Sequence, residues 1–178
     1  LDGTDAVMLS AETAIGEFPV AAVRFLQRVL TATEKAYGGR MAQDRMNPAE
    51  TANPNEAENA LSFAACLLAT RLGARAIIAP VQSMDTALSI ARFRPQALLV
   101  MVANSVRLYR SLALVRGISP LVVNAPDDGA EAHACLAQAR EWLFAHGLAQ
   151  EGDLAVLLST SGAAGDKADT LQAVRLNS

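Results

Sequence analysis

The sequence has no excess of basic residues and no long hydrophobic run. Its 178 residues include 15 lysines and arginines, scattered singly, against 18 aspartates and glutamates. A nucleic-acid-binding domain needs a basic patch, so no nucleic-acid partner is predicted. The longest apolar runs, such as residues 97–103, reach only the length of a strand, whereas a membrane-spanning helix needs about 20 residues. No secretory signal is visible either, and we therefore expect a cytoplasmic protein without a membrane partner.

Cysteine and histidine are equally scarce, with two of each. Cys66 and Cys135 lie in Ala- and Leu-rich helical patterns, which is typical of small buried side chains rather than of a disulfide or a metal site. His133 is two residues from Cys135, and on a helix this spacing places the side chains on different faces. Because His133 and His146 fall in one predicted helix, no Ser-His-Asp or Cys-His arrangement for nucleophilic catalysis can be assembled.

The composition is otherwise that of a folded globular protein. Hydrophobic residues make up 52% of the chain, charged residues 19%, and the net charge is −3. A chain of this length can form one ordinary domain with an appendage. The sequence therefore predicts a protein with a substantial core rather than a disordered one.

The first forty residues follow the pattern of one strand, loop and helix. Residues 5–10 are predicted to form a short buried strand, and Pro19 suits the first turn of a helix that stops at Gly38 and Gly39. A single such unit cannot bury both faces of its strand. The next stretch is polar, contains two prolines and lacks periodicity, which indicates a linker. The predicted organisation is residues 1–39 as a βα unit, residues 40–54 as the linker and residues 55–178 as an α/β domain.

The second domain alternates helical patterns with short apolar runs. Asn55 is a plausible N-cap of its first helix, which ends at Gly73. Strands that are apolar on both faces and alternate with helices predict a three-layer α/β/α open sheet of about five strands, mostly parallel. The last strand follows a short connection and is predicted to be antiparallel. The predicted strands are residues 76–81, 97–103, 118–124, 153–159 and 171–176, and the helices between them are residues 84–93, 106–115 and 129–146.

The turn after residues 76–81 is the clearest candidate site. Ser83 and Thr86 place hydroxyls beside the free backbone N–H groups of a helix start, and such a terminus favours an anion such as phosphate. The alternative is that Ser83 is only the N-cap of this helix. Asp85 favours the alternative, because a carboxylate in the first turn would repel a phosphate.

Two further loops hold candidate residues. The loop of residues 159–169 contains glycine and Lys167, one of two lysines in the chain, and could fold over an anionic ligand or serve as a plain connection. Ser10 and Glu12 directly follow the first predicted strand. In βα architectures, loops at the carboxyl ends of strands build the active site.

The opening stretch DGTDAVMLSAETAIGEFPVAAV closely resembles a segment of the pyruvate kinase family, its last barrel strand, loop and helix. NEAENALSFAACLLATRLGARAII, TALSIARFRPQALLVMVANSVRLYRSLALVRGISPLVV and HGLAQEGDLAVLLSTSG are similar to that family's C-terminal domain. The resemblance covers essentially the whole chain. It implies that residues 1–39 are the remnant of a catalytic (β/α)8 barrel and that residues 55–178 are the C-terminal α/β domain.

The resemblance implies phosphoryl transfer from phosphoenolpyruvate to ADP in the parent enzyme, with Mg²⁺ and K⁺. The family's catalytic lysine, metal-binding carboxylates and substrate-contacting threonine would lie outside this chain. Only Ser10 and Glu12 map onto the barrel's active-face loop, where Ala11 stands in place of the usual glycine. We therefore expect the chain alone to be inactive and to hold no cofactor. Without its barrel neighbours, the strand of residues 5–9 is expected to rearrange, to pair with another molecule or to become disordered.

The resemblance also implies a regulatory and assembly role. In the family, this domain holds subunit contacts and often a site for a phosphorylated effector on the turn that contains Ser83 and Thr86. Here Met84 replaces a glycine and Asp85 a frequently basic residue, so we expect a weakened effector site. The expected partners are the N-terminal barrel of the parent enzyme and further copies of the chain. The alternatives are a stand-alone module that binds a small phosphorylated effector and an unrelated open-sheet protein.

Overall fold

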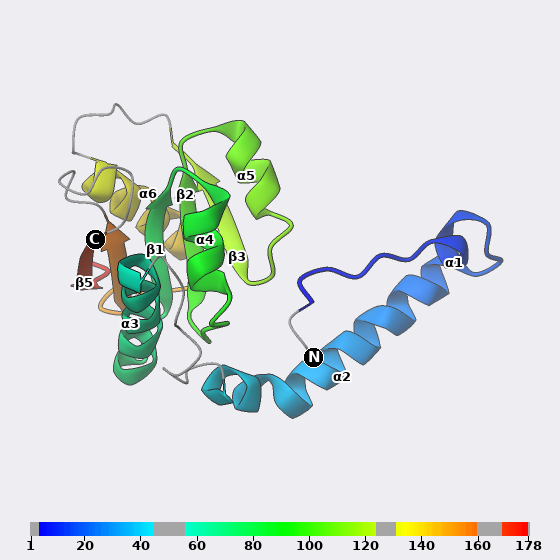
Figure 1. Cartoon of the computed structure of the whole chain (residues 1–178). Helices are drawn as coiled ribbons and strands as arrows, with labels where there is room; N and C mark the ends of the chain where they lie inside the picture. Colours follow the sequence, from blue (N-terminus) through cyan, green and yellow to red (C-terminus); the bar gives the residue numbers. More distant parts are fainter. Residues whose placement is uncertain (1–3, 45–55, 124–130, 160–168, 178) are drawn as a thin grey trace.

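The computed structural model describes residues 4–44, 56–123, 131–159 and 169–177 (Figure 1). They form an α/β domain from which a helical arm projects. The arm consists of residues 4–44 and contains α1 (Ala11–Ala14) and α2 (Pro19–Asp44). The elements of the domain are α3 (Glu56–Leu72), β1 (Ala76–Val81), α4 (Met84–Ala91), β2 (Leu98–Ala103), α5 (Val106–Leu112), β3 (Ile118–Val122), α6 (Glu131–Ala145), β4 (Leu154–Ser159) and β5 (Thr170–Arg175).

The five strands form one sheet in the order β3-β2-β1-β4-β5. β1 pairs in parallel with β2 and β4, β2 pairs in parallel with β3, and β5 is antiparallel to β4. The predicted sheet and its antiparallel last strand are confirmed. Each predicted strand agrees with the observed one to within two residues at either end.

The core has two layers because alternate residues of each strand face opposite sides of the sheet. Ile77 and Met101 face α3, α4 and α5, while Ile78 and Val100 face α6. All four side chains have no exposed surface. Strands buried on both faces account for the continuous apolar runs in the sequence.

The end of α3 shows how a single glycine fixes a boundary. Gly73 has φ of +61°, a conformation that costs glycine little. The N–H of Ala74 donates to the carbonyl of Ala69 at 2.9 Å, which closes the helix in the manner of a Schellman motif. The predicted helix end at Gly73 is confirmed. The predicted cap Asn55 lies outside the described residues.

Two predictions for the arm are wrong. Residues 5–10 form no strand, and all of them except the partly buried Leu9 are exposed. An isolated extended segment leaves its backbone N–H and C=O groups without a ladder, and none of the described strands pairs with it. The helix also does not stop at Gly38 and Gly39, because α2 continues to Asp44. Glycine within a helix costs only about 1 kcal/mol, which neighbouring helical residues can offset. Residues 40–44 of the predicted linker are therefore helical, and the remainder lies outside the described part of the chain.

Candidate functional site

The first turn of α4 has the geometry of a capped helix start. Ser83 is extended, with φ of −138° and ψ of 162°, and its Oγ accepts from the N–H of Thr86 at 3.5 Å. The two hydroxyl oxygens of Ser83 and Thr86 are also 3.5 Å apart. Ser83 is therefore the N-cap, as predicted. Thr86 is buried, and Asp85 is exposed in the same turn.

A chain of hydroxyl groups ties this turn to the neighbouring helix. The Oγ atoms of Ser62 in α3 and Ser89 in α4 are 2.9 Å apart, and Ser89 Oγ donates to the carbonyl of Thr86 at 2.7 Å. Ser62 has no exposed surface, so the contact lies inside the packing between the two helices. Satisfied buried hydroxyl groups of this kind hold the first turn of α4 in place.

The start of α5 repeats the arrangement with the opposite charge. Ser105 Oγ accepts from the N–H of Leu108 at 3.3 Å, and Arg107 occupies the position that corresponds to Asp85. Both charged side chains are exposed. The α4 turn can thus offer hydroxyl and backbone N–H donors to an anion, but it carries a carboxylate that the α5 turn lacks.

The second predicted part of this site is the loop of residues 159–169, and only its two ends lie within the described residues. Because β1 and β4 are parallel neighbours, the loop after β4 begins at the same edge of the sheet as the α4 turn. The loop's ends are joined, since the N–H of Asp169 donates to the carbonyl of Ser159 at 3.0 Å. Lys167 lies outside the described residues, so its proximity to Ser83 and Thr86 stays a prediction.

Ser10 and Glu12 lie elsewhere, at the far end of the arm (Figure 1). Ser10 Oγ accepts from the N–H of Ala11 at 2.7 Å, and the N–H of Ser10 donates to Glu12 Oε2 at 3.0 Å. Hydrogen bonds from the backbone N–H groups of Glu12 itself and of Ser10 lower the pKa of the Glu12 carboxyl group. These two residues cap α1 and do not meet the α4 turn.

The described residues contain no group of three or more His, Cys, Asp or Glu side chains that could hold a metal ion. Cys66 and Cys135 are both buried, which confirms the prediction of small buried side chains. His146 is exposed, with its Nδ1 2.8 Å from the carbonyl oxygen of Trp142 at the end of α6. Among the described helices, none has the length and hydrophobicity needed to cross a bilayer.

A polar junction between the arm and the domain was not predicted. Arg94 and Arg116, at the amino-terminal edge of the sheet, bind Thr4, Asp5 and Glu34 of the arm around a cavity of about 560 Å³. The partners are 82 to 90 residues apart in sequence, so no motif spacing could reveal the pairing. The feature of the sequence that could have indicated the junction is Arg94, which stands directly before Pro95 at the end of a predicted helix.

The comparison that decides the family is a match of residues 59–174 to the sequence model described as pyruvate kinase, alpha/beta domain. The chain belongs to the pyruvate kinase family. The match includes most or all of each element from α3 to β5. The resemblance inferred from the sequence is therefore confirmed, and what the chain shares with pyruvate kinases is their C-terminal portion.

Individual pyruvate kinases agree with this assignment. The chain is 36% identical to pyruvate kinase 2 of Synechocystis sp. over 159 residues, which are 88% of this chain and 25% of that protein. It is 37% identical to the pyruvate kinase of Sporosarcina psychrophila over 121 residues, 68% of this chain and 20% of the relative. The chain thus spans about a quarter of these relatives or less.

Solved structures show the same fold. A crystal structure of Cryptosporidium parvum pyruvate kinase superimposes with a TM-score of 0.80 over 98% of this chain and 33% of that chain, at 24% identity. A second pyruvate kinase structure from the same organism superimposes with a TM-score of 0.82. The predicted α/β class is confirmed.

Proposed function

We propose that this chain is the regulatory and assembly portion of a pyruvate kinase, and that it does not catalyse the reaction alone. The complete enzyme would transfer a phosphoryl group from phosphoenolpyruvate to ADP, with Mg²⁺ and K⁺, in glycolysis in the cytoplasm. The observation that carries the proposal is the match of residues 59–174 to the family's alpha/beta domain. The place of Ser10 and Glu12 at the tip of the arm supports it, because the hydrogen bonds that these two side chains make there belong to the cap of α1.

The described residues offer no carboxylate cluster for Mg²⁺. This ion takes oxygen ligands that include carboxylates, and no group of three or more His, Cys, Asp or Glu side chains that could hold a metal ion exists among these residues. We therefore assign no step of the reaction to a metal held by this portion. The cations would be bound by the remainder of the enzyme.

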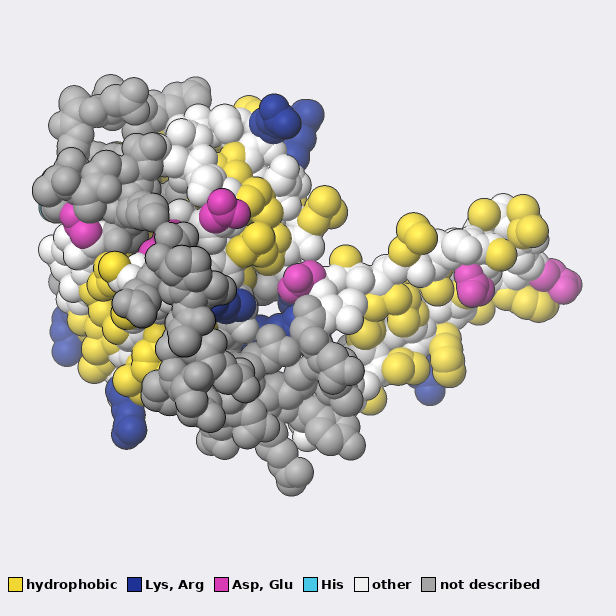
Figure 2. Space-filling model, viewed as in Figure 1, with side chains coloured by type: hydrophobic (Ala, Val, Ile, Leu, Met, Phe, Trp, Pro, Cys, Tyr) yellow, Lys and Arg dark blue, Asp and Glu magenta, His cyan; other side chains and the backbone are white. Residues whose placement is uncertain are grey.

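The arm supports the N-terminal barrel of the parent enzyme as a partner. Figure 2 shows hydrophobic side chains along the surface of the arm. Phe18, directly before α2, and Val20 and Phe25 within α2 are each more than 60% exposed. A protein rarely leaves a contiguous apolar surface of this kind in water. We propose that these side chains pack against the barrel.

Association of further copies through the α/β domain is also proposed. β5 is an edge strand of the sheet, and Gln172 and Ala173 within it are exposed. An exposed edge strand can add a strand from another molecule. Sedimentation of the chain over a range of concentrations tests this, and a monomer at all of them would contradict it.

A coupled assay tests the catalytic part of the proposal. The purified chain, given phosphoenolpyruvate, ADP, Mg²⁺ and K⁺, should form no pyruvate above the blank, while an intact pyruvate kinase in the same buffer shows that the assay works. Turnover that copurifies with the chain and falls on Glu12→Gln would contradict the proposal.

The proposed regulatory role includes a site for a phosphorylated effector. We propose that it lies at the α4 turn and binds phosphorylated ligands weakly, because Asp85 would lie close to the bound anion. The stand-alone module with a strong phosphorylated effector is thereby disfavoured.

A further inference from the structure

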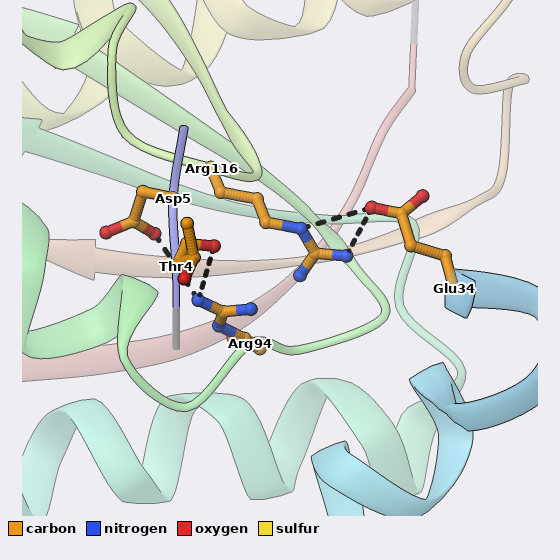
Figure 3. Close-up of polar contacts among 5 residues, drawn as sticks. All are labelled: Thr4, Asp5, Glu34, Arg94 and Arg116. Carbon is orange, nitrogen blue, oxygen red and sulfur yellow. Dashed lines mark hydrogen bonds and ion pairs between the residues drawn. The ribbon is translucent and has the colours of Figure 1, made fainter. Parts of the chain in front are cut away.

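Two arginines at the amino-terminal edge of the sheet contact the arm at separate points (Figure 3). Arg94 Nη2 donates to the carbonyl oxygen of Thr4 at 3.1 Å and lies 3.6 Å from Asp5 Oδ1. Arg116 donates through Nε at 3.3 Å and Nη2 at 2.8 Å, both to Glu34 Oε1. Arg94 thus holds the segment before α1, and Arg116 holds the middle of α2.

Arg94 occupies a position whose backbone conformation favours glycine. Arg94 has φ of +48° and is the one non-glycine residue with a positive φ in the described part of the chain. This conformation is strained for an L-residue, and Pro95 further restricts the residue before it. Glycine would occupy the position without strain. Residues in this conformation persist where surrounding contacts hold them, and here the contacts include the backbone N–H of Arg94, which donates to the carbonyl of Ala91 at 3.0 Å, as well as those of the guanidinium group.

The arm and the edge of the sheet are not closely packed between the two arginines. A cavity of about 560 Å³ separates them, lined on the arm by Thr4, Val7, Leu30 and Thr33 and on the domain by Gln96 and Leu99. Close packing across this volume therefore cannot fix the arm. The charged contacts on either side of the cavity hold the arm to the domain at this edge.

We propose that Arg94 and Arg116 form a two-point clamp that recognises two separate acidic side chains of the same chain, Asp5 and Glu34, and sets the direction in which the arm leaves the domain. Arg94 is the stronger point. Its side chain is 13% exposed against 37% for Arg116, so its contacts are less screened by solvent. Arg94 also donates a charge-assisted hydrogen bond to the carbonyl of Thr4, beside its ion pair with Asp5. This assignment holds whatever effector the domain binds.

Pulsed electron paramagnetic resonance, which measures the distance between two spin labels, can test the clamp in the full chain. Gln27→Cys on α2 and Leu114→Cys after α5 provide exposed labelling sites on the arm and the domain. Cys66 and Cys135 are at most 1% exposed and should stay unlabelled. The parent chain, which here means the chain that carries only these two labelling substitutions, should give a single narrow distribution of distances between the labels.

Arg94→Ala should abolish the narrow distribution, and Arg94→Gly should do the same although glycine relieves the backbone strain. Arg116→Ala should broaden the distribution less. Arg110→Ala, which removes an exposed arginine of α5 outside the junction, is the matched control and should change nothing. Salt of about 1 M, where the Debye length is about 3 Å, should broaden the parent distribution.

A narrow distribution retained in Arg94→Ala would overturn the proposal, and so would one retained in Arg94→Gly alone, because the backbone would then be the cause. Circular dichroism checks that each variant is folded. If Arg94 variants fail to fold, the double variant Asp5→Ala, Glu34→Gln removes the partner charges from the exposed arm without altering the domain. It should broaden the distribution, and an unchanged one overturns the clamp.

Discussion

Reversing the charge at position 85 should have opposite effects on stability and on anion binding. Asp85 lies in the first turn of α4, directly after Met84, the first residue of the helix. A carboxylate there interacts favourably with the positive end of the helix dipole, by about 0.3–1 kcal/mol. Asp85→Arg loses this interaction and adds a repulsion of similar size, so the free energy of unfolding should fall by about 1 kcal/mol. For a protein of this length, the melting temperature should fall by about 3 °C.

The same change should strengthen phosphate binding at the α4 turn. Two unit charges about 6 Å apart in water interact by about 0.7 kcal/mol. Changing the side chain from −1 to +1 alters the interaction with a singly charged anion by about 1.4 kcal/mol, which is about tenfold in affinity. Isothermal titration with inorganic phosphate and with a sugar bisphosphate measures this gain beside a thermal melt of the same samples.

The start of α5 supplies the matched control, because Ser105 caps that helix as Ser83 caps α4. Arg107→Asp should raise the melting temperature and leave phosphate binding at the α4 turn unchanged. If Asp85→Arg lowers the melting temperature without raising phosphate affinity, Ser83 is only a helix cap and the turn is no anion site. Robust micromolar binding by the parent chain would show that the expected penalty from Asp85 is wrong.

Two further predictions concern the core. Met101 has no exposed surface and lies in the central part of the sheet. Met101→Ala should therefore lower the free energy of unfolding by about 2–5 kcal/mol in denaturant titrations, whereas Met8→Ala, at an 86% exposed position, should change it little. Equal losses of stability in the two variants would contradict the two-layer core. Burial raises the pKa of the Cys66 thiol from 9.0 to about 12, which favours the neutral form in the folded state. The contribution of this group is therefore complete below about pH 9 and is lost as the pH rises toward 12, by up to about 4 kcal/mol. Cys66→Ala should lack this alkaline loss, and parallel stability curves for the two proteins would refute it.

The α/β domain could be predicted closely from the sequence because its signals are local. β1 begins and ends at the predicted residues, since Ala76–Val81 is an apolar run between a glycine turn and the Ser83 cap. Gly73 and Ser83 each fix a boundary through their own backbone conformation or side chain. The cap at the candidate site was predictable for the same reason. The clamp was not, because Arg94 and Thr4 meet only once the whole chain is folded.

The arm shows why a helix and a strand differ in what a local sequence can specify. A helix forms its backbone hydrogen bonds within one segment, so α2 is helical although Val20 and Phe25 are exposed. A strand needs a neighbour for the same bonds, and residues 5–10 have none among the described strands. The apolar pattern of residues 5–10 indicates that these side chains should be buried, but it does not show which other segment would pack against them. An arm with a formed helix and exposed apolar side chains has no core of its own to orient it. Among the described residues, the contacts proposed to set its direction relative to the domain are the polar ones at the junction, and Arg94, with its mostly buried side chain, is the one to which we assign the largest share.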